Sequence, residues 1–193
     1  MMELVFASSN QNKVAEIQKL VGNKFRLLSL KDIHCTEEIA ETGTTFQENA
    51  LIKAKYVFEK YRYNCFGDDS GLEVEALNNA PGVYSARYAG EPKNDANNTK
   101  KLLTEMDANS NRKACFKTVV ALVMDGKETF FEGKINGQIT LQPIGSGGFG
   151  YDPVFIPDGY DRTFAQMSLD EKNLISHRAI ATQKLVDYLT HKL

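Results

Sequence analysis

Residues 3 to 30 read ELVFASSNQNKVAEIQKLVGNKFRLLSL, and the hydrophobic pattern changes twice within them. Glu3 to Ser8 is an apolar run that ends in small polar residues, which predicts a buried β-strand. Arg26 to Leu30 predicts a second strand. Between them, apolar residues recur at the spacing of one helix face, at Val14, Ile17, Leu20 and Val21. A strand, a helix and a strand in this order favour an α/β fold.

The next part of the chain extends this alternation. Thr44 and Thr45 can cap a long helix. Its expected apolar face consists of Phe46, Ala50, Ala54, Val57, Phe58 and Tyr61. A strand is expected to end near Cys65 to Gly71, and Leu72 to Leu77 alternates like a further strand. Asn94 to Asp107 then predicts a polar surface helix.

The last third of the chain favours hairpins and two short helices. Cys115 to Met124 and Glu128 to Leu141 are rich in β-branched and aromatic residues, and Asp125-Gly126 between them is a strong hairpin signal. Ser168 opens a capping box, and Ser176 can cap a final helix. The whole pattern predicts one α/β domain over residues 1–193, with a mixed β-sheet and flanking helices.

Composition limits the classes of partner. The chain has 193 residues, 42% of them hydrophobic, and a net charge of -2. There is no overall basic field for a nucleic acid or an anionic membrane, so a polyanion would have to be small and met by a local cation cluster. The chain has three separated cysteines and no signal-peptide pattern, which predicts a cytoplasmic protein. It has no long apolar run, so we expect it not to lie in a membrane.

Residues 65–71, CFGDDSG, set two carboxylates side by side. Asp68 and Asp69 repel each other, and neither is easily buried without a cation or a strong hydrogen-bond donor nearby. On residue types alone the stretch is favoured as a solvated turn. The alternative is a metal-binding pair of carboxylates.

Two further stretches suggest phosphate binding. Residues 8–13, SSNQNK, lie where the first strand gives way to a helix, and helix N-termini attract anions. An ordinary helix start capped by Ser9 or Asn10 explains the stretch equally well. Lys53 lies four residues after Asn49 on one helix face. It is either a surface lysine with a packed stem or a cation directed at a phosphate.

An acidic patch precedes that helix, at Glu37, Glu38 and Glu41. Most acidic loops are simply solvated. One of these carboxylates could nevertheless join Asp68 and Asp69 in holding Mg²⁺.

Residues 145–150, GSGGFG, match the dinucleotide pattern G-x-G-x-x-G, but the Tyr-Asp-Pro that follows cannot open the helix which that fingerprint needs. Glycines around Phe149 fit a loop that presents one aromatic ring to a base, or a plain glycine-rich turn. Lys172, His177 and Arg178 add three cationic or donor groups within seven positions.

Six stretches together resemble the inosine triphosphate pyrophosphatase family, whose members act on non-standard purine triphosphates. They are ASSNQNKVAEI (7–17), ETGTTFQENALIKA (41–54), GDDSGLEV (67–74), APGVYSARYAG (80–90), GGFGYDPVF (147–155) and SHR (176–178). The resemblance implies an elongated mixed sheet with flanking helices, two lobes around a central cleft, and a homodimer. It also implies Mg²⁺-dependent hydrolysis of ITP, dITP and XTP to the monophosphate and pyrophosphate.

The resemblance also assigns roles to residues of this chain. It implies that Asp69 is catalytic and accepts a proton, and that Glu41, Asp68 and Asp69 form the metal site. The implied triphosphate contacts are Ser8, Ser9, Asn10, Gln11, Asn12, Lys13 and Lys53, and Ser70 touches the substrate. The implied base and sugar contacts are Phe149, Gly150, Tyr151, Asp152, Lys172, His177 and Arg178.

Two other functions stay open. A non-catalytic nucleotide sensor could use the same residues, although it would not need paired carboxylates. A pyrophosphatase that prefers canonical or modified pyrimidine triphosphates would share the same phosphate chemistry.

Overall fold

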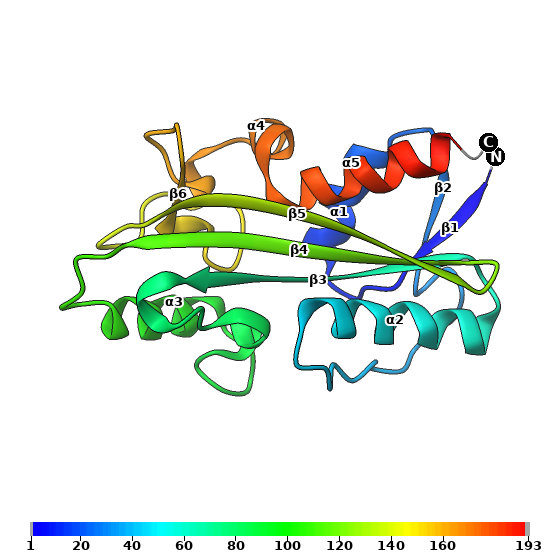
Figure 1. Ribbon diagram of the computed structural model, residues 1–193, viewed down its shortest axis with the longest axis horizontal. Helices are drawn as coiled ribbons and strands as arrows, with labels where there is room; N and C mark the ends of the chain where they lie inside the picture. Colours follow the sequence, from blue (N-terminus) through cyan, green and yellow to red (C-terminus); the bar gives the residue numbers. More distant parts are fainter. Residues whose placement is uncertain (1, 192–193) are drawn as a thin grey trace. The chain divides into compact units, whose positions relative to one another are not determined.

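The computed structural model describes residues 2–191, which form a mixed α/β fold (Figure 1). A six-stranded sheet has the strand order β2-β1-β3-β4-β5-β6. The strands are β1 (Glu3–Phe6), β2 (Arg26–Ser29), β3 (Cys65–Val74), β4 (Lys113–Met124), β5 (Lys127–Ile139) and β6 (Phe155–Pro157). The helices are α1 (Gln11–Val21), α2 (Phe46–Tyr61), α3 (Asp95–Glu105), α4 (Leu169–Ile175) and α5 (His177–Thr190). The predicted fold class, an α/β fold with a mixed sheet and flanking helices, is confirmed.

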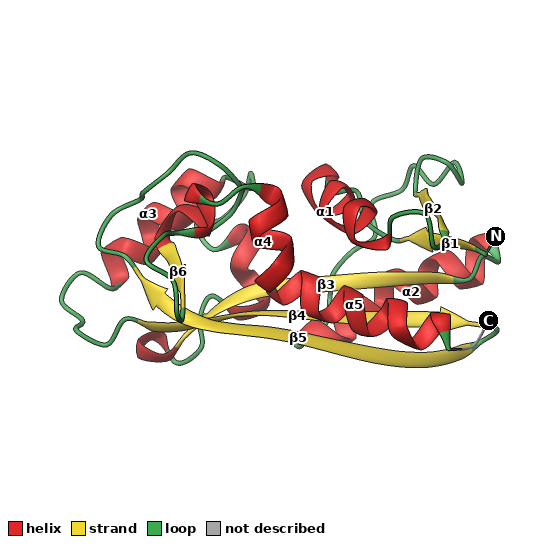
Figure 2. Cartoon of the chain, turned by 90° about the horizontal axis from the view of Figure 1, so that it is seen from above, coloured by secondary structure: helices red, strands yellow, loops and turns green. Residues whose placement is uncertain are grey.

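The sheet changes from parallel to antiparallel pairing along its strand order. β1 pairs in parallel with both β2 and β3, whereas β5 pairs antiparallel with β6. β4 and β5 are long neighbouring strands, visible side by side in Figure 2. They are joined through Asp125 and Gly126, which both have positive φ, as the predicted hairpin turn requires.

The chain divides into two compact units. Unit 1 comprises the described residues within Met1–Asp69, Thr118–Gly133 and Arg178–Leu193. Unit 2 comprises Ser70–Lys117 and Lys134–His177.

Unit 1 has a hydrophobic core on each face of its strands. Leu4 and Phe6 of β1 pack with Ile17 of α1 and Leu185 of α5, whereas their neighbour Val5 packs in a second cluster with residues of α2. Alternate strand residues point to opposite faces, so β1 contributes to both cores. Figure 1 shows α1 and α5 on one side of these strands and α2 on the other.

Unit 2 has one core. It packs Leu72 of β3, Phe116 of β4 and Leu102 of α3 with aromatic residues of the C-terminal third, Tyr151, Phe155 and Phe164. The Phe116 ring meets the Phe155 ring edge-on at a centroid distance of 4.7 Å.

One prediction about the strands is wrong. The stretch 65–71 does not end a strand or form a solvated turn, and Leu72 to Leu77 is not a separate strand. Cys65–Val74 is a single ten-residue strand, β3, followed by a short 3-10 helix. The two aspartates and Gly67 therefore lie within a buried strand, where neighbouring α2 and α1 supply the polar partners that a turn would have found in water.

No helix among residues 2–191 is long and apolar enough to cross a membrane.

Candidate active site

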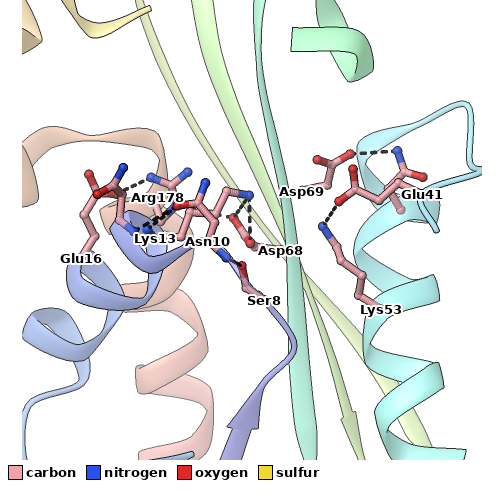
Figure 3. Close-up of polar contacts among 11 residues, drawn as sticks. Ser8, Asn10, Lys13, Glu16, Glu41, Lys53, Asp68, Asp69 and Arg178 are labelled. Carbon is pink, nitrogen blue, oxygen red and sulfur yellow. Dashed lines mark hydrogen bonds and ion pairs between the residues drawn. The ribbon is translucent and has the colours of Figure 1, made fainter. Parts of the chain in front are cut away.

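The two adjacent aspartates of β3 point to opposite faces of the strand (Figure 3). Asp68 lies on the α1 and α5 side, where it meets Lys13 and Arg178. Asp69 lies on the α2 side, where it meets Asn49. Because neighbouring strand side chains diverge, the chain can bury both carboxylates without bringing them face to face.

Asp68 belongs to a buried ionic network. Its carboxylate lies 2.9 Å from Lys13 Nζ and 3.5 Å from Arg178 Nε. Arg178 also pairs with Glu16 of α1, and both of these side chains are almost fully buried. The order Glu16, Arg178, Asp68 and Lys13 alternates in charge, which is the arrangement that makes buried charges tolerable.

Asp69 is held from the N-terminal half of α2. Asn49 Nδ2 donates a hydrogen bond to Asp69 Oδ2 at 3.0 Å, and Asn49 Oδ1 accepts one from the Gly43 N–H at 2.8 Å. One helical turn further on, Lys53 pairs with Glu41. The segment that carries Glu41 is thereby attached to the helix that faces Asp69.

The two aspartates are driven to opposite protonation behaviour. Burial would raise the pKa of Asp68, but Lys13, Arg178 and Lys53 outweigh it and hold that pKa below its usual value. Burial raises the pKa of Asp69, and Lys53 and Lys13 do not cancel this effect, while the charge of Glu41 adds to it. Asp68 is therefore the fixed anion, and Asp69 is the carboxylate that takes a proton more readily.

Burial and the same neighbouring charges also shift the pKa values of Lys53 and Lys13. Burial would lower the pKa of Lys53, but Asp68, Glu41 and Asp69 outweigh it and raise that pKa. For Lys13, burial prevails over the attraction of Asp68, and the nearby cations Lys53 and Arg178 lower its pKa further.

Two glycines allow α2 to pack close to the side of β3 that carries Asp69. A Cβ at Gly67 of β3 would lie 2.4 Å from the Ala50 carbonyl oxygen of α2, and one at Gly43 would lie 2.6 Å from Glu48 Cβ. Both contacts are closer than real Cβ atoms allow, so only glycine lets Asn49 and Lys53 approach the strand here.

Two of the three acidic residues before α2, Glu37 and Glu41, contact different parts of that helix. Glu37 contacts Lys60 and Tyr61 near the end of α2, whereas Glu41 contacts Lys53. Lys60 is seven residues beyond Lys53, which is roughly 10 Å along a helix. Of these three, Glu41 is the one whose charge acts on Asp69.

The structure does not gather the predicted metal residues into a ready-made site. Within residues 2–191, no three His, Cys, Asp or Glu side chains are arranged to hold a metal ion. Asp68 faces away from Asp69 and Glu41, toward Lys13. The assignment of Glu41, Asp68 and Asp69 to a metal stays a prediction.

The predicted phosphate-binding stretch forms the start of α1. Asn10 is the N-cap, one of the two caps that the sequence allowed, and its Oδ1 accepts the N–H groups of Asn12 and Lys13. Ser8 Oγ accepts the Asn10 N–H. Ser9, Gln11 and Asn12 are exposed.

The predicted base-binding residues lie in unit 2, apart from Arg178. The Lys172 ammonium lies 2.7 Å from Asp152 Oδ2 and 4.7 Å from the centroid of the Phe149 ring. Asp152 Oδ2 also accepts the Phe149 N–H at 2.9 Å. A Cβ at Gly148 would lie 2.1 Å from that same oxygen, so this position has no room for a side chain.

Two other predicted substrate contacts in unit 2, Tyr151 and His177, are buried and contact other protein groups. Tyr151 is buried and donates its hydroxyl to the Ser85 carbonyl at 2.8 Å. His177 is buried with its ring stacked on Phe116 at 4.7 Å. Ser70 is half-buried on β3, directly after Asp69. The roles of these residues as substrate contacts stay predictions.

Sequence reasoning missed several residues that build this geometry. Glu16 lies three residues after Lys13 and so on the same helix side, but nothing in the sequence distinguishes it from a surface glutamate. The role of Asn49 was not foreseen either. Gly43 and Gly67 are visible in the sequence, but the close helix approach that requires a glycine at each position is a tertiary property.

The comparisons with known proteins agree over nearly the whole chain. Residues 4–188 match the model of the Ham1 family. A protein of Flavobacterium psychrophilum named dITP/XTP pyrophosphatase is 55% identical over 187 residues, which cover 97% of this chain and 98% of that protein. A protein of the same name from Porphyromonas gingivalis is 52% identical, with 98% of each chain covered.

Solved structures give the same result. The Staphylococcus aureus Ham1 protein superposes with a TM-score of 0.90 at 38% identity, covering 99% of this chain and 100% of that one. A HAM1 protein from Coxiella burnetii superposes with a TM-score of 0.91 at 39% identity and the same coverage. From the family model, the relatives and these structures, this chain belongs to the Ham1 family.

Proposed function

We propose that this protein is a nucleoside-triphosphate pyrophosphatase that hydrolyses dITP, XTP and ITP to the monophosphate and pyrophosphate. The names of its relatives support the dITP and XTP part of the proposal. The observation that carries it is the pair Asp68 and Asp69, whose pKa values are shifted in opposite directions among buried cations. This separation keeps Asp68 ionised and leaves Asp69 as the carboxylate that can accept a proton.

In this proposal Asp69 accepts the proton of the attacking water. Its raised pKa makes it a better base than an ordinary aspartate, and the Asn49 amide fixes one of its oxygens. Asp68 has a different task. It holds Lys13 at the start of α1, where this lysine and Lys53 can offset the charge of a triphosphate.

The residues on the α2 side fit a hard divalent cation. The charge of Glu41 raises the pKa of Asp69, so the two carboxylates act on each other, and carboxylate oxygens are the donors that Mg²⁺ prefers. We propose Mg²⁺ as the cofactor, with Glu41 and Asp69 as its protein ligands and Asp68 in support. When bound, the ion supplies charge neutralisation at the phosphates and a lower pKa for water.

Unit 2 would supply the base-binding residues. Phe149 presents an aromatic ring beside the ammonium of Lys172, and Asp152 anchors both of them. A purine could stack on this ring, and neighbouring donors could pair with its 6-keto oxygen. Adenine has an amino group at that position, so the donors of Lys172 and His177 would disfavour ATP.

One experiment tests the proposal. The protein is incubated with Mg²⁺ and a panel of purine and pyrimidine triphosphates, and pyrophosphate and orthophosphate are measured separately. We expect pyrophosphate from ITP, dITP and XTP at a kcat/KM well above that for ATP and clearly above that for GTP. Asp69→Asn should lower the rate of pyrophosphate release by about 10²- to 10⁴-fold, and the exposed surface variant Asp158→Asn is the matched control. Binding without any product would support the sensor, and preferential cleavage of pyrimidines would support the third candidate.

Two further expectations belong to the same proposal. We propose that the protein acts as a homodimer in the cytoplasm, where the nucleotide pool that it would cleanse is found. Light scattering coupled to size-exclusion chromatography measures the oligomeric state, and a monomer at micromolar concentration would contradict the first of these expectations.

A further inference from the structure

The segment Phe149 to Asp152 is held in place by helix α3, which contributes none of the residues assigned to the substrate. Asp95 Oδ2 accepts the Gly150 N–H at 2.7 Å across 55 positions of sequence. Thr99 Oγ1, one turn further along α3, donates to the Gly150 carbonyl at 3.4 Å. Both ends of the glycine are therefore in contact with the same helix, within unit 2.

We infer that Asp95 is a positioning residue that sets the backbone of the base-binding segment and thereby the affinity for the purine. The inference rests on the proposed function, because it assumes that Phe149 stacks on a base. The hydrogen bond of Asp95 is to the Gly150 N–H. It acts through the Gly150 peptide, which directly follows the stacking residue.

Asp95 is not needed to cap its own helix. The N-cap of α3 is Asn94, whose side chain accepts the Asn97 N–H at 2.9 Å. A carboxylate in the first turn also stabilises a helix through its dipole. The short distance to Gly150 shows a second, directional contact, because hydrogen bonds to an ionised acceptor are shorter and stronger than neutral ones.

The conformation of Gly150 explains why an anchor is useful. Its φ is +60°, and no atom lies within 4 Å of where a Cβ would be. Packing against a side chain therefore does not fix this residue, and glycine has more conformational freedom than any other residue. Hydrogen bonds to its N–H and carbonyl replace the packing that a side chain would have provided.

The rest of α3 is built to stay in position. Asn98 is buried, and its amide donates to the Ala86 carbonyl at 3.0 Å and accepts the Ala89 N–H at 2.7 Å. Tyr151, next to Gly150, donates to the Ser85 carbonyl in the same stretch. The helix and the base-binding segment thus share one support, residues 85–89, and Asp95 adds the direct link between them.

The test separates the base from the phosphates. Binding of IMP and of pyrophosphate is measured separately by calorimetry for the wild type and Asp95→Ala. We expect Asp95→Ala to lower the affinity for IMP by about tenfold, the order expected for losing a charge-assisted hydrogen bond. The affinity for pyrophosphate should be unchanged. Asp95→Asn, which keeps an acceptor oxygen, should recover part of the loss.

A matched variant controls for the helix dipole. Asp95→Ala combined with Ala96→Asp restores a carboxylate to the first turn at an exposed position next to Asp95. It should bind IMP as weakly as Asp95→Ala does. Hydrogen exchange of the peptide that contains Gly150 should be faster in both variants.

Unchanged IMP affinity in Asp95→Ala, equal weakening of IMP and pyrophosphate, or full recovery in the double variant would each overturn the inference. Failure of the proposed function looks different, because the wild type itself would then release no pyrophosphate from ITP.

Discussion

Asn49 Nδ2 lies 3.0 Å from Asp69 Oδ2, and the same carboxamide accepts the Gly43 N–H at 2.8 Å. Asn49 is completely buried. One side chain therefore orients Asp69 and fixes the segment that carries Glu41. We expect Asn49→Ala to lower kcat by about tenfold or more, because a buried carboxylate loses its donor, while KM changes little. Steady-state kinetics measures this split, with the exposed Asn23→Ala as control; a rise in KM at unchanged kcat would remove Asn49 from this role.

Substitution of Asp69 should mainly lower kcat, whereas substitution of Asp68 should mainly lower the stability of the fold. Asp69→Asn should keep the fold and lose about 10²- to 10⁴-fold in kcat, as expected for loss of a general base. Asp68→Asn removes the buried anion that pairs with Lys13 and Arg178, and breaking such a pair typically costs about 3–5 kcal/mol in the free energy of unfolding. Denaturant unfolding and kcat, measured on both variants, distinguish them. Near-normal turnover of Asp69→Asn would exclude it as the base.

The lysines should act on the outer phosphates. We expect Lys13→Ala and Lys53→Ala to weaken ITP binding much more than IMP binding. Lys13 also pairs with the buried Asp68, and Lys53 pairs with the half-buried Glu41. The unfolding free energies of both variants must therefore be measured alongside. Calorimetry with a non-hydrolysable ITP analogue and with IMP measures the loss of affinity for each ligand. Equal weakening of the two ligands would mean that the lysines are structural or contact the sugar and base.

Arg178 has two possible effects that kinetics can separate. If Arg178 binds the purine base, Arg178→Ala should reduce the ratio of kcat/KM for ITP to kcat/KM for ATP. This is the outcome we expect. Its pairing with Glu16 and Asp68 predicts in addition a loss of stability. Glu16→Gln should show part of both effects, because it loosens the guanidinium without removing it. If activity on ITP and ATP falls by one common factor, the guanidinium serves the ionic network alone.

Local patterns were enough to predict the elements of this fold but not the setting of its polar residues. The helix start at Thr45 and the hairpin turn at Asp125 both follow from short-range signals. Local preference predicts a turn at Asp68 and Asp69, because two adjacent carboxylates, a serine and glycines are turn formers, whereas the structure has a strand there. What keeps them in a strand is tertiary: Lys13 and Arg178 on one face and Asn49 on the other.

Glu37 gives a prediction about stability and pH that is independent of the active site. The Lys60 ammonium, and after it the Tyr61 hydroxyl, hold the pKa of Glu37 at about 2, compared with an ordinary value of 4.5. A carboxyl whose pKa is lower in the folded state contributes stability above its unfolded pKa and loses it as the pH falls through the folded value. The stabilisation by Glu37 should thus be present above about pH 4.5 and disappear by about pH 2.

The comparison of wild type with Glu37→Gln isolates this group. The difference in unfolding free energy should be modest, because the pair is solvent-exposed, and it should shrink as salt is added. Denaturant unfolding at several pH values between 2 and 7 measures it, with Glu38→Gln, one position along in the same exposed segment, as the control. A difference that is constant over this pH range, or that grows toward acid, would show that the ionised Glu37 carboxylate does not stabilise the end of α2.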